Sequence, residues 1–170
     1  MPFSLLNGQY ESGATFRGAA LVQDMSLGLV GKRKFRAYRE FTTAVTIKLV
    51  FSKPFLLTSQ RLWTGQGAAR AVISTGGTES GTFTTLPSKF CLNTIGGDAA
   101  GFTTALFGGT VTGGTEREVL NADSGTAGGG SGNADLLSSA RMLGAGTYYI
   151  TITPTGTTRG TWSIEWEELD

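Results

Sequence analysis

Two pairs of acidic residues have the spacing that a glycoside hydrolase uses. Each pair lies two positions apart in a segment with strand character: Glu116 with Glu118, and Glu165 with Glu167. On a regular strand such carboxylates share one face, about 6.5–7 Å apart, which suits the cleavage of glycosidic bonds. Glu165 and Glu167 alternate with an aromatic row, however, so they occupy the face where a strand carries solvated charges. Glu116 is followed at once by Arg117. We therefore expect no catalytic residues.

Few other side chains offer reactive chemistry. The sequence has no histidine and one cysteine, Cys91, which lies between Phe90 and Leu92. Without imidazole there is no Ser-His-Asp or Cys-His catalysis and no usual general base near neutral pH. A lone cysteine with apolar neighbours forms no intrachain disulfide and is typical of a small hydrophobic side chain in a strand. The sequence predicts a protein that is not an enzyme and has no cofactor.

A glycine-rich stretch, 121–135, contains the oxygen ligands that Ca²⁺ prefers: Asn121, Asp123, Asn133 and Asp135. The stretch lacks the close alternating spacing of a dedicated calcium loop. Its composition is typical of a flexible linker. We expect a linker and no metal.

Basic residues crowd into one short segment with aromatic residues between them. Base stacking on nucleic acid, plain solvation and a protein contact are the three interpretations. The net charge of +1 gives little general attraction to nucleic acid. We favour a protein contact and expect no nucleic-acid partner, while solvation stays open. The candidate contact residues are Lys32, Arg33, Lys34, Phe35, Arg36, Tyr38 and Arg39.

An aromatic row near the C-terminus, formed by Tyr148, Trp162 and Trp166, has two interpretations. Exposed, the row could stack on sugar rings. Because the tryptophans alternate with Ser and Glu, core packing is the favoured interpretation.

The elements that carry these residues are predicted to be strands. Residues 44–51 alternate apolar and polar residues, as do 147–153 and 161–167. The last two segments flank a Pro/Gly/Thr-rich stretch, 154–160, and are predicted to form an antiparallel hairpin. Weaker strands are expected around 56–64, 69–75, 82–86, 90–94, 102–107 and 116–120. Turns are expected at Gly76-Gly77, Gly96-Gly97, Gly108-Gly109 and Gly113-Gly114.

This pattern predicts an all-β fold, an antiparallel β-sandwich or jelly roll with at most one short helix, at 134–143. Residues 1–40 show no lasting period and are expected to form an extended arm or first layer, with the sandwich domain at 41–170. No segment has the length of a membrane span or the pattern of a signal peptide, so no membrane partner is expected.

Charge is divided unevenly along the chain. Residues 1–70 hold ten Lys/Arg and three Asp/Glu, whereas residues 71–170 hold four Lys/Arg and ten Asp/Glu. Opposite net charges on the two halves of the chain favour head-to-tail contacts between copies, or contacts with a shell of protein.

In its glycine-rich arm, short Thr/Gly-rich strands and lack of a secretion signal, the chain resembles small structural proteins of tailed-bacteriophage virions, particularly capsid decoration or cement proteins. The segment Gly146-Thr147-Tyr148-Tyr149-Ile150-Thr151-Ile152-Thr153 is also similar to the last strands of carbohydrate-binding sandwich modules. The resemblance implies a homo-oligomer, commonly a trimer, that contacts the major capsid protein or another virion protein. It implies synthesis in the host cytoplasm and a final location in the virion. A glycan-binding or receptor-binding module is the alternative, followed by a carboxylate-dependent glycoside hydrolase.

Overall fold

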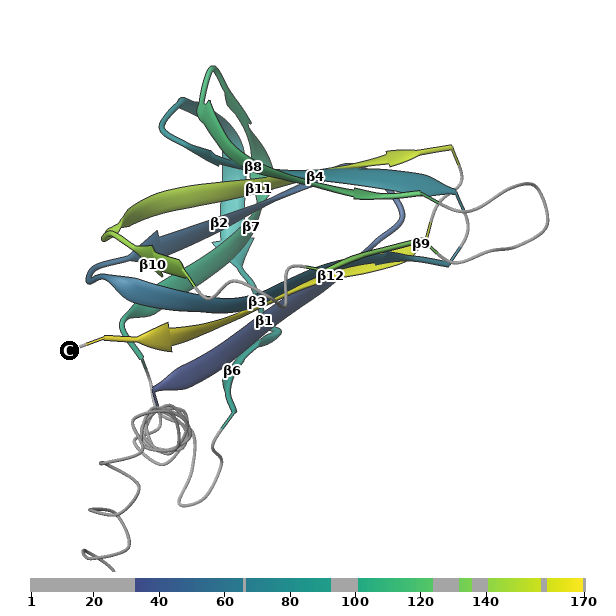
Figure 1. Ribbon diagram of the computed structural model, residues 1–170. Helices are drawn as coiled ribbons and strands as arrows, with labels where there is room; N and C mark the ends of the chain where they lie inside the picture. Colours follow the sequence, from purple (N-terminus) through teal and green to yellow (C-terminus); the bar gives the residue numbers. More distant parts are fainter. Residues whose placement is uncertain are drawn as a thin grey trace, which may run out of the picture.

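The computed structural model describes residues 33–65, 67–92, 101–123, 132–135, 141–156 and 159–169, with only the backbone of 132–135. Every regular element in these residues is a β-strand, and all the strand pairs are antiparallel. The strands form two sheets that lie face to face (Figure 1). The fold is an all-β antiparallel sandwich, as the alternating pattern predicts.

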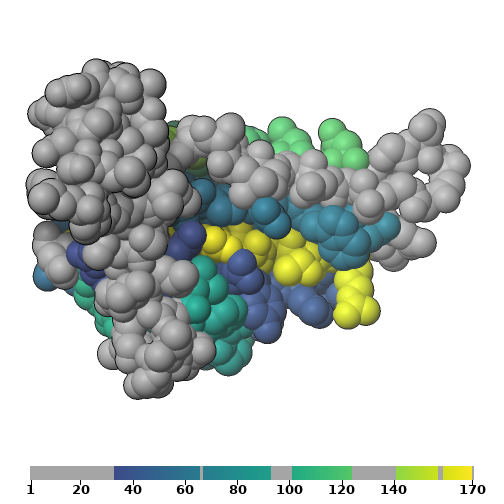
Figure 2. All heavy atoms as spheres, turned by 60° about the horizontal axis from the view of Figure 1, so that its bottom comes forward, coloured from purple at the N-terminus to yellow at the C-terminus, as the bar shows by residue number. Residues whose placement is uncertain are grey.

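Sheet A has the strand order β10-β3-β12-β1-β6, and β9 pairs with β3 beside β10. Its strands are β1 (Lys34–Phe41), β3 (Phe55–Thr64), β6 (Lys89–Cys91), β9 (Gly132–Asp135), β10 (Arg141–Leu143) and β12 (Gly160–Glu168). Figure 2 shows the outer side of this sheet, with β12 in yellow between β3 and β1.

Sheet B has the strand order β5-β7-β2-β11-β4-β8. Its strands are β2 (Val45–Phe51), β4 (Ala68–Thr75), β5 (Thr78–Thr85), β7 (Thr103–Thr112), β8 (Thr115–Ala122) and β11 (Gly146–Thr155).

The core lies between the inner faces of the two sheets. Period-two alternation sends Ile47, Leu49 and Phe51 of β2 inward, and all three are buried. Phe51 stacks on Phe55 of the opposite sheet, with ring centroids 3.5 Å apart. Trp166 meets the edge of Phe51, so aromatic contacts join the two layers at one end of the sandwich.

The predicted C-terminal hairpin is wrong. β11 and β12 do not pair, because β11 lies in sheet B and β12 lies in sheet A. Both strands have one apolar face, and the connection between them crosses from one layer to the other. In this arrangement both strands turn their apolar faces toward the interior between the sheets. A hairpin within one sheet would also turn both apolar faces toward that interior. Alternation alone therefore does not distinguish the two arrangements.

Two further expectations are corrected at the ends of predicted elements. The helix expected at 134–143 is wrong at both ends, because residues 134–135 belong to β9 and 141–143 to β10; residues 136–140 lie outside the described residues. Residues 34–40, grouped by sequence with the N-terminal arm or first layer, form most of β1 inside sheet A. Residues 1–32 lie outside the described residues.

One long two-stranded ribbon supplies both edges of sheet B. β4 pairs with β8 up to Thr75↔Thr115, and β5 pairs with β7 from Thr78↔Thr112, in the same register. Two glycine pairs face each other between these ladders, Gly76-Gly77 and Gly113-Gly114. A Cβ on Gly77 would lie 2.8 Å from the carbonyl oxygen of Thr112, so this corner requires glycine. The β4–β5 and β7–β8 connections lie side by side at the top of Figure 1.

The ribbon folds across the outer face of sheet B. Glu79 of β5 bonds to Lys48 of β2 and to Tyr149 of β11, and Phe83 packs near Tyr149. The expected turn at Gly108-Gly109 lies instead inside β7, next to a shift of register between Ser80 and Phe83. The expected turn at Gly96-Gly97 lies outside the described residues.

Candidate functional site

The basic segment of β1 is divided between the two faces of sheet A. Lys34, Arg36 and Tyr38 project from the outer face, whereas Phe35 and Ala37 are buried against sheet B. A strand turns successive side chains to opposite faces, so one contact surface cannot include the whole segment. Of the predicted contact residues, only those on the outer face of sheet A can therefore contact a partner there.

Arg39 belongs to the inner face as well. Its guanidinium lies 4.0 Å from the ring centroid of Phe107, a residue of β7 in sheet B. This cation–π contact links the two layers at one side of the sandwich. Of the predicted contact residues, Phe35 and Arg39 thus stabilise the fold, Lys32 lies outside the described residues, and Arg33 precedes β1.

The strand register brings side chains from distant parts of the sequence together on the outer face. Tyr38 of β1 lies across from Ser163 of β12, which lies across from Arg61 of β3. The next row contains Trp63 of β3, opposite Thr161. Neighbouring strands are about 4.8 Å apart, so these rows form one continuous patch across the middle of sheet A.

We call this patch the A face; it contains Arg36, Tyr38, Arg61, Trp63, Phe90, Thr161, Ser163 and Glu165. All of these residues except Trp63 line a shallow hollow of about 270 Å³. Tyr38 is 40% exposed and Trp63 is 44% exposed. The ring of Tyr38 meets Phe90 of β6 edge-on, with centroids 6.2 Å apart.

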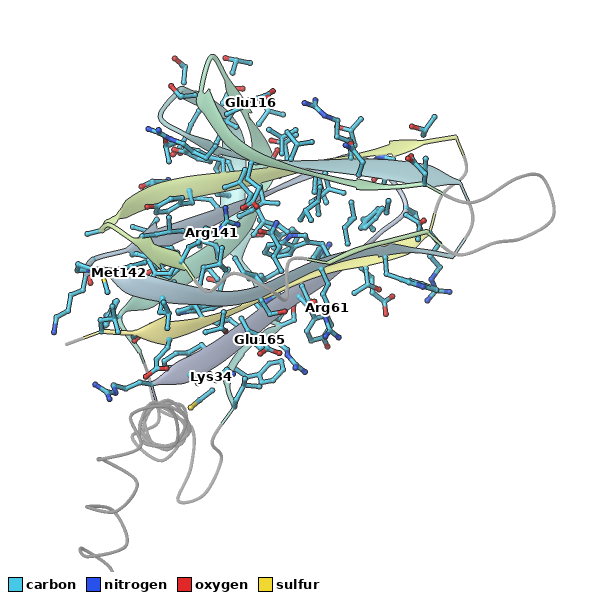
Figure 3. All side chains as sticks on the ribbon, viewed as in Figure 1. Lys34, Arg61, Glu116, Arg141, Met142 and Glu165 are labelled. Atoms are coloured by element: carbon cyan, nitrogen blue, oxygen red, sulfur yellow. The ribbon has the colours of Figure 1, made fainter. Side chains whose placement is uncertain are left out.

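Charge on the A face is largely paired within the chain. Arg36 donates from Nε to Oε1 of Glu165 at 2.9 Å, and the Nζ of Lys34 lies 3.6 Å from the same carboxylate. Figure 3 shows Lys34, Glu165 and Arg61 along the outer side of sheet A. The paired charges hold the side chains around the hollow in place, because each ion pair restricts two long side chains.

Trp63 and Arg61 were missed by sequence reasoning. The segment 56–64 gave only a weak strand signal, and the outward residues of β3 lie far in sequence from the basic cluster. The sequence alone does not show that Trp63 faces outward; only the structure shows that it is exposed while its neighbours Leu62 and Thr64 are fully buried.

The structure separates one of the two candidate carboxylate pairs, Glu116 and Glu118, whereas Glu165 and Glu167 stay on the same outward row of β12. A bulge in the β4–β8 ladder makes Ile73 pair with Glu118 and Ser74 pair with Glu116, which leaves Arg117 as the extra residue. Glu116 therefore pairs with exposed Arg70, while Glu118 binds Arg141 at the inner side of β8. The bulge thus turns the two carboxylates to opposite faces of the sheet.

The aromatic row near the C-terminus belongs to the core. Trp162 and Trp166 are fully buried, and Tyr148 is partly buried against them and their neighbours. The core interpretation is confirmed, and these tryptophans cannot form a sugar-binding platform.

Glu168 is a buried carboxylate that sequence reasoning missed. It continues the inward row of Trp162, Ile164 and Trp166 on β12. Its oxygens accept hydrogen bonds from the amides of Phe102 and Thr103, at 2.8 and 3.1 Å, and from the Thr103 hydroxyl at 2.7 Å. These bonds satisfy a charge that would be costly to bury alone, and they attach β12 to the start of β7.

Lys89 of β6 lies in the same region. Burial lowers the pKa of its ammonium group, and the charge of Glu168 partly opposes that shift. Its Nζ also donates to the carbonyl of Thr103. Lys89, Thr103 and Glu168 form a polar link between the two sheets.

The stretch predicted to be a linker or calcium loop is partly strand. Asn121 and Ala122 are the last two residues of β8, and Asn133 and Asp135 lie in β9; residues 124–131 lie outside the described residues. Within the part of the chain that the structure describes, no three His, Cys, Asp or Glu residues gather as metal ligands.

The fold and the A face define an antiparallel β-sandwich with one exposed aromatic and cationic surface. No family model matches the sequence, and no curated protein matches it. Among solved structures, the Eiger TNF protein from S. frugiperda covers 76% of the chain at 9% identity, with a TM-score of 0.28. The infectious bursal disease virus Gx strain covers 80% at 13% identity, with a TM-score of 0.15.

A third structure, the VP2 subviral particle of infectious bursal disease virus, covers 79% of the chain at 11% identity, with a TM-score of 0.14. The chain spans 60%, 38% and 35% of the lengths of these three proteins.

Proposed function

We propose that the chain is a non-enzymatic structural module of a virion, and that the A face is its contact with another protein of the particle. The single observation that carries the contact is the exposure of Tyr38 and Trp63 on one sheet face. Tyrosine, tryptophan and arginine are the residues most enriched where protein interfaces gain their binding energy.

The chemistry of the A face supports a protein partner. The hollow places Tyr38 and Phe90 beside the guanidinium groups of Arg36 and Arg61. These groups come from three strands of one sheet, so the strand pairing already fixes the backbone that carries them. Little conformational entropy is then lost when a partner covers them.

The location in a virion rests on the resemblance to bacteriophage decoration proteins. In this proposal the partner is the major capsid protein or another virion protein, and the module acts as a homo-oligomer, with a trimer favoured. A partner that covers the exposed rings of Tyr38 and Trp63 fits this surface best.

Sedimentation with particles tests the proposal. Particles assembled without the protein are mixed with wild-type protein or with a double variant, Tyr38→Ala with Trp63→Ala, and the bound protein is quantified. We expect the double variant to bind at least about tenfold more weakly, because truncated interface aromatics commonly cost about 2 kcal/mol or more. Alanine at these exposed positions leaves the core unchanged.

Met142→Ala is the matched control, because Met142 is 73% exposed but lies on β10, away from the A face. Figure 3 shows its side chain at the far end of the sandwich. Charge reversal at Arg36 is a poorer test, since it also breaks the pair with Glu165. Wild-type occupancy by the double variant would contradict the A-face contact, and absence of wild-type protein from particles would contradict the virion role.

A glycan-binding module is the second candidate, because the same hollow places Tyr38 beside the hydroxyl groups of Thr161 and Ser163. Aromatic rings with neighbouring hydroxyl groups suit sugar stacking and hydrogen bonding. A glycan array separates the two functions: binding that Tyr38→Ala abolishes, without loss of particle association, favours the glycan.

A further inference from the structure

A second pocket opens between the edges of the two sheets, away from the A face. Its volume is about 320 Å³, within the range of small-molecule sites. Leu57 and Leu143 of sheet A and Ile73 of sheet B form its apolar walls. A smaller apolar cavity lined by these three residues continues the pocket into the core.

The charged groups of this pocket are placed there by the bulge in β8. Arg117 and Glu118 are neighbours in sequence, and on a regular strand they would point to opposite faces. The extra residue at the bulge lets both side chains line the same pocket. Bulges of this kind often redirect a side chain at a binding site.

The ion pairs of the pocket leave one cation in excess. Nη2 of Arg141 donates to both oxygens of Glu118, at 2.6 Å to Oε2, so this carboxylate is already occupied. Figure 3 shows Arg141 reaching from β10 into the space between the sheets. Nε of Arg141 is buried and has no hydrogen-bond partner among the described residues.

Arg117 is the excess cation. Its Nε donates to the hydroxyl of Thr75 at 2.9 Å, and within the described part of the chain it forms no ion pair. Tyr148 lies close by: burial raises the pKa of its hydroxyl, and the charge of Arg117 partly opposes that shift. A positive group therefore stands beside an aromatic ring at the edge of an apolar pocket.

We propose that this pocket binds a small monocarboxylate with a short apolar chain or ring. The carboxylate pairs with Arg117, and the apolar part lies against Leu57, Ile73, Leu143 and Tyr148. Glu118 is occupied by Arg141, which disfavours a cationic ligand. A phosphate would bring more charge than one excess guanidinium can balance, and it would have no use for the apolar walls.

Titration calorimetry of the full chain with octanoate tests this proposal, with octan-1-ol and octylamine as probes that change only the head group. We expect saturable binding of octanoate, with a Kd of about 1 mM or tighter. The alcohol and the amine should bind at least about tenfold more weakly, because they lose the charge-assisted hydrogen bonds to Arg117.

Two variants locate the site. Arg117→Gln should weaken octanoate binding at least about tenfold, and Leu143→Trp should abolish it by filling the pocket. Arg70→Gln is the matched control, because Arg70 pairs with Glu116 on the outer face of the same sheet. Circular dichroism verifies that each variant is folded.

Absence of saturable octanoate binding to the wild-type protein would overturn the proposal. So would equal affinity of folded Arg117→Gln, or equal affinity for octan-1-ol. None of these outcomes involves the A face, so the particle-association proposal is tested separately.

Discussion

Arg36 lies directly across from Glu165 in the register of β1 and β12, and its Nε donates to the Glu165 carboxylate at 2.9 Å. The two residues come from the basic and the acidic halves of the sequence. Other described ion pairs also join the two halves: Lys34 with Glu165, Lys48 with Glu79, Arg70 with Glu116, and Arg159 with Glu40. Three carboxylates of the acidic half, Glu79, Glu116 and Glu165, thus pair with cations of the basic half within one chain, whereas Arg159 and Glu40 join the halves with the opposite signs.

A double-mutant cycle on Arg36 and Glu165 measures this pairing. Arg36→Ala, Glu165→Ala and the double variant are unfolded with urea. We expect a coupling energy of about 0.5 kcal/mol, because Arg36 is partly exposed and solvent screens the pair. The coupling should fall as salt is added. Additive effects of the two single variants would show that the contact contributes no stability.

The carboxylate of Glu168 should be essential for stability. Glu168→Ala leaves the amides of Phe102 and Thr103 without their acceptor, and we expect a loss of about 3 kcal/mol in the free energy of unfolding. Glu168→Gln keeps one acceptor oxygen and should lose less. Glu167→Gln, on the outer face, is the control. Equal stability of Glu168→Ala and wild type in urea denaturation would refute this role.

The two tryptophans Trp162 and Trp63 should respond oppositely to truncation. Trp162→Ala removes a fully buried ring and should cost about 3–5 kcal/mol of folding stability. Trp63→Ala removes a ring that is 44% exposed, so the cost should be about 1 kcal/mol or less. Chemical denaturation of both variants provides the comparison. A stable Trp162→Ala protein is incompatible with the packing described here.

The glycine corner of the ribbon predicts that Gly77→Ala lowers the stability of the protein more than Gly113→Ala does. Gly113→Ala has free space around the new methyl group but keeps a φ of +72°, so it should cost about 1 kcal/mol. Gly77→Ala combines a φ of +101° with a Cβ placed 2.8 Å from the Thr112 oxygen. We expect a cost of about 3 kcal/mol there. Thermal unfolding ranks the two variants, and the reverse order would be inconsistent with this corner.

Tyr149 should make the protein less stable at high pH. Burial and the hydrogen bond to Glu79 raise the pKa of Tyr149 to about 12, from 10.0. The folded state therefore holds this proton more tightly than the unfolded state. The resulting stabilisation is complete below pH 10 and is lost as the pH rises to about 12.

The phenylalanine variant isolates this effect. Between pH 10 and about 12, the free energy of unfolding of Tyr149→Phe should fall less steeply than that of the wild type. Tyr148 remains in both proteins, so its titration cancels in the comparison. Parallel curves for the two proteins would argue against the shift.

Alternation was sufficient to predict most strands. In segments such as 44–51 and 161–167 the buried apolar residues lie on the row that the sequence indicates, although Thr46 of the opposite row is also buried. β1 has the same period in Phe35, Ala37, Arg39 and Phe41, but the basic residues between them obscured it. Glu168 was missed because a carboxylate at an inward position is stable only through partners more than sixty residues away.

The candidate sites were less predictable, because they depend on register. A one-residue bulge at Arg117 moves Glu116 and Glu118 to opposite faces, and nothing local in the sequence marks it. Likewise, Tyr38 and Arg61 become neighbours only because β12 lies between their strands. Which sheet a strand joins is decided by packing of the whole core, as the separation of β11 from β12 illustrates.

The ribbon that forms both edges of sheet B has a consequence for how the chain folds. Its pair Thr85↔Leu106 encloses roughly 20 residues, and each further pair extends an existing ladder at little entropic cost. We expect strand pairing to propagate along this ladder from Thr85↔Leu106, through the glycine pairs Gly76-Gly77 and Gly113-Gly114, to Ala69↔Ala122. The central strands β2 and β11 would then be the last to pair in sheet B. They would insert between the β5–β7 and β4–β8 pairs, which the ribbon has already connected.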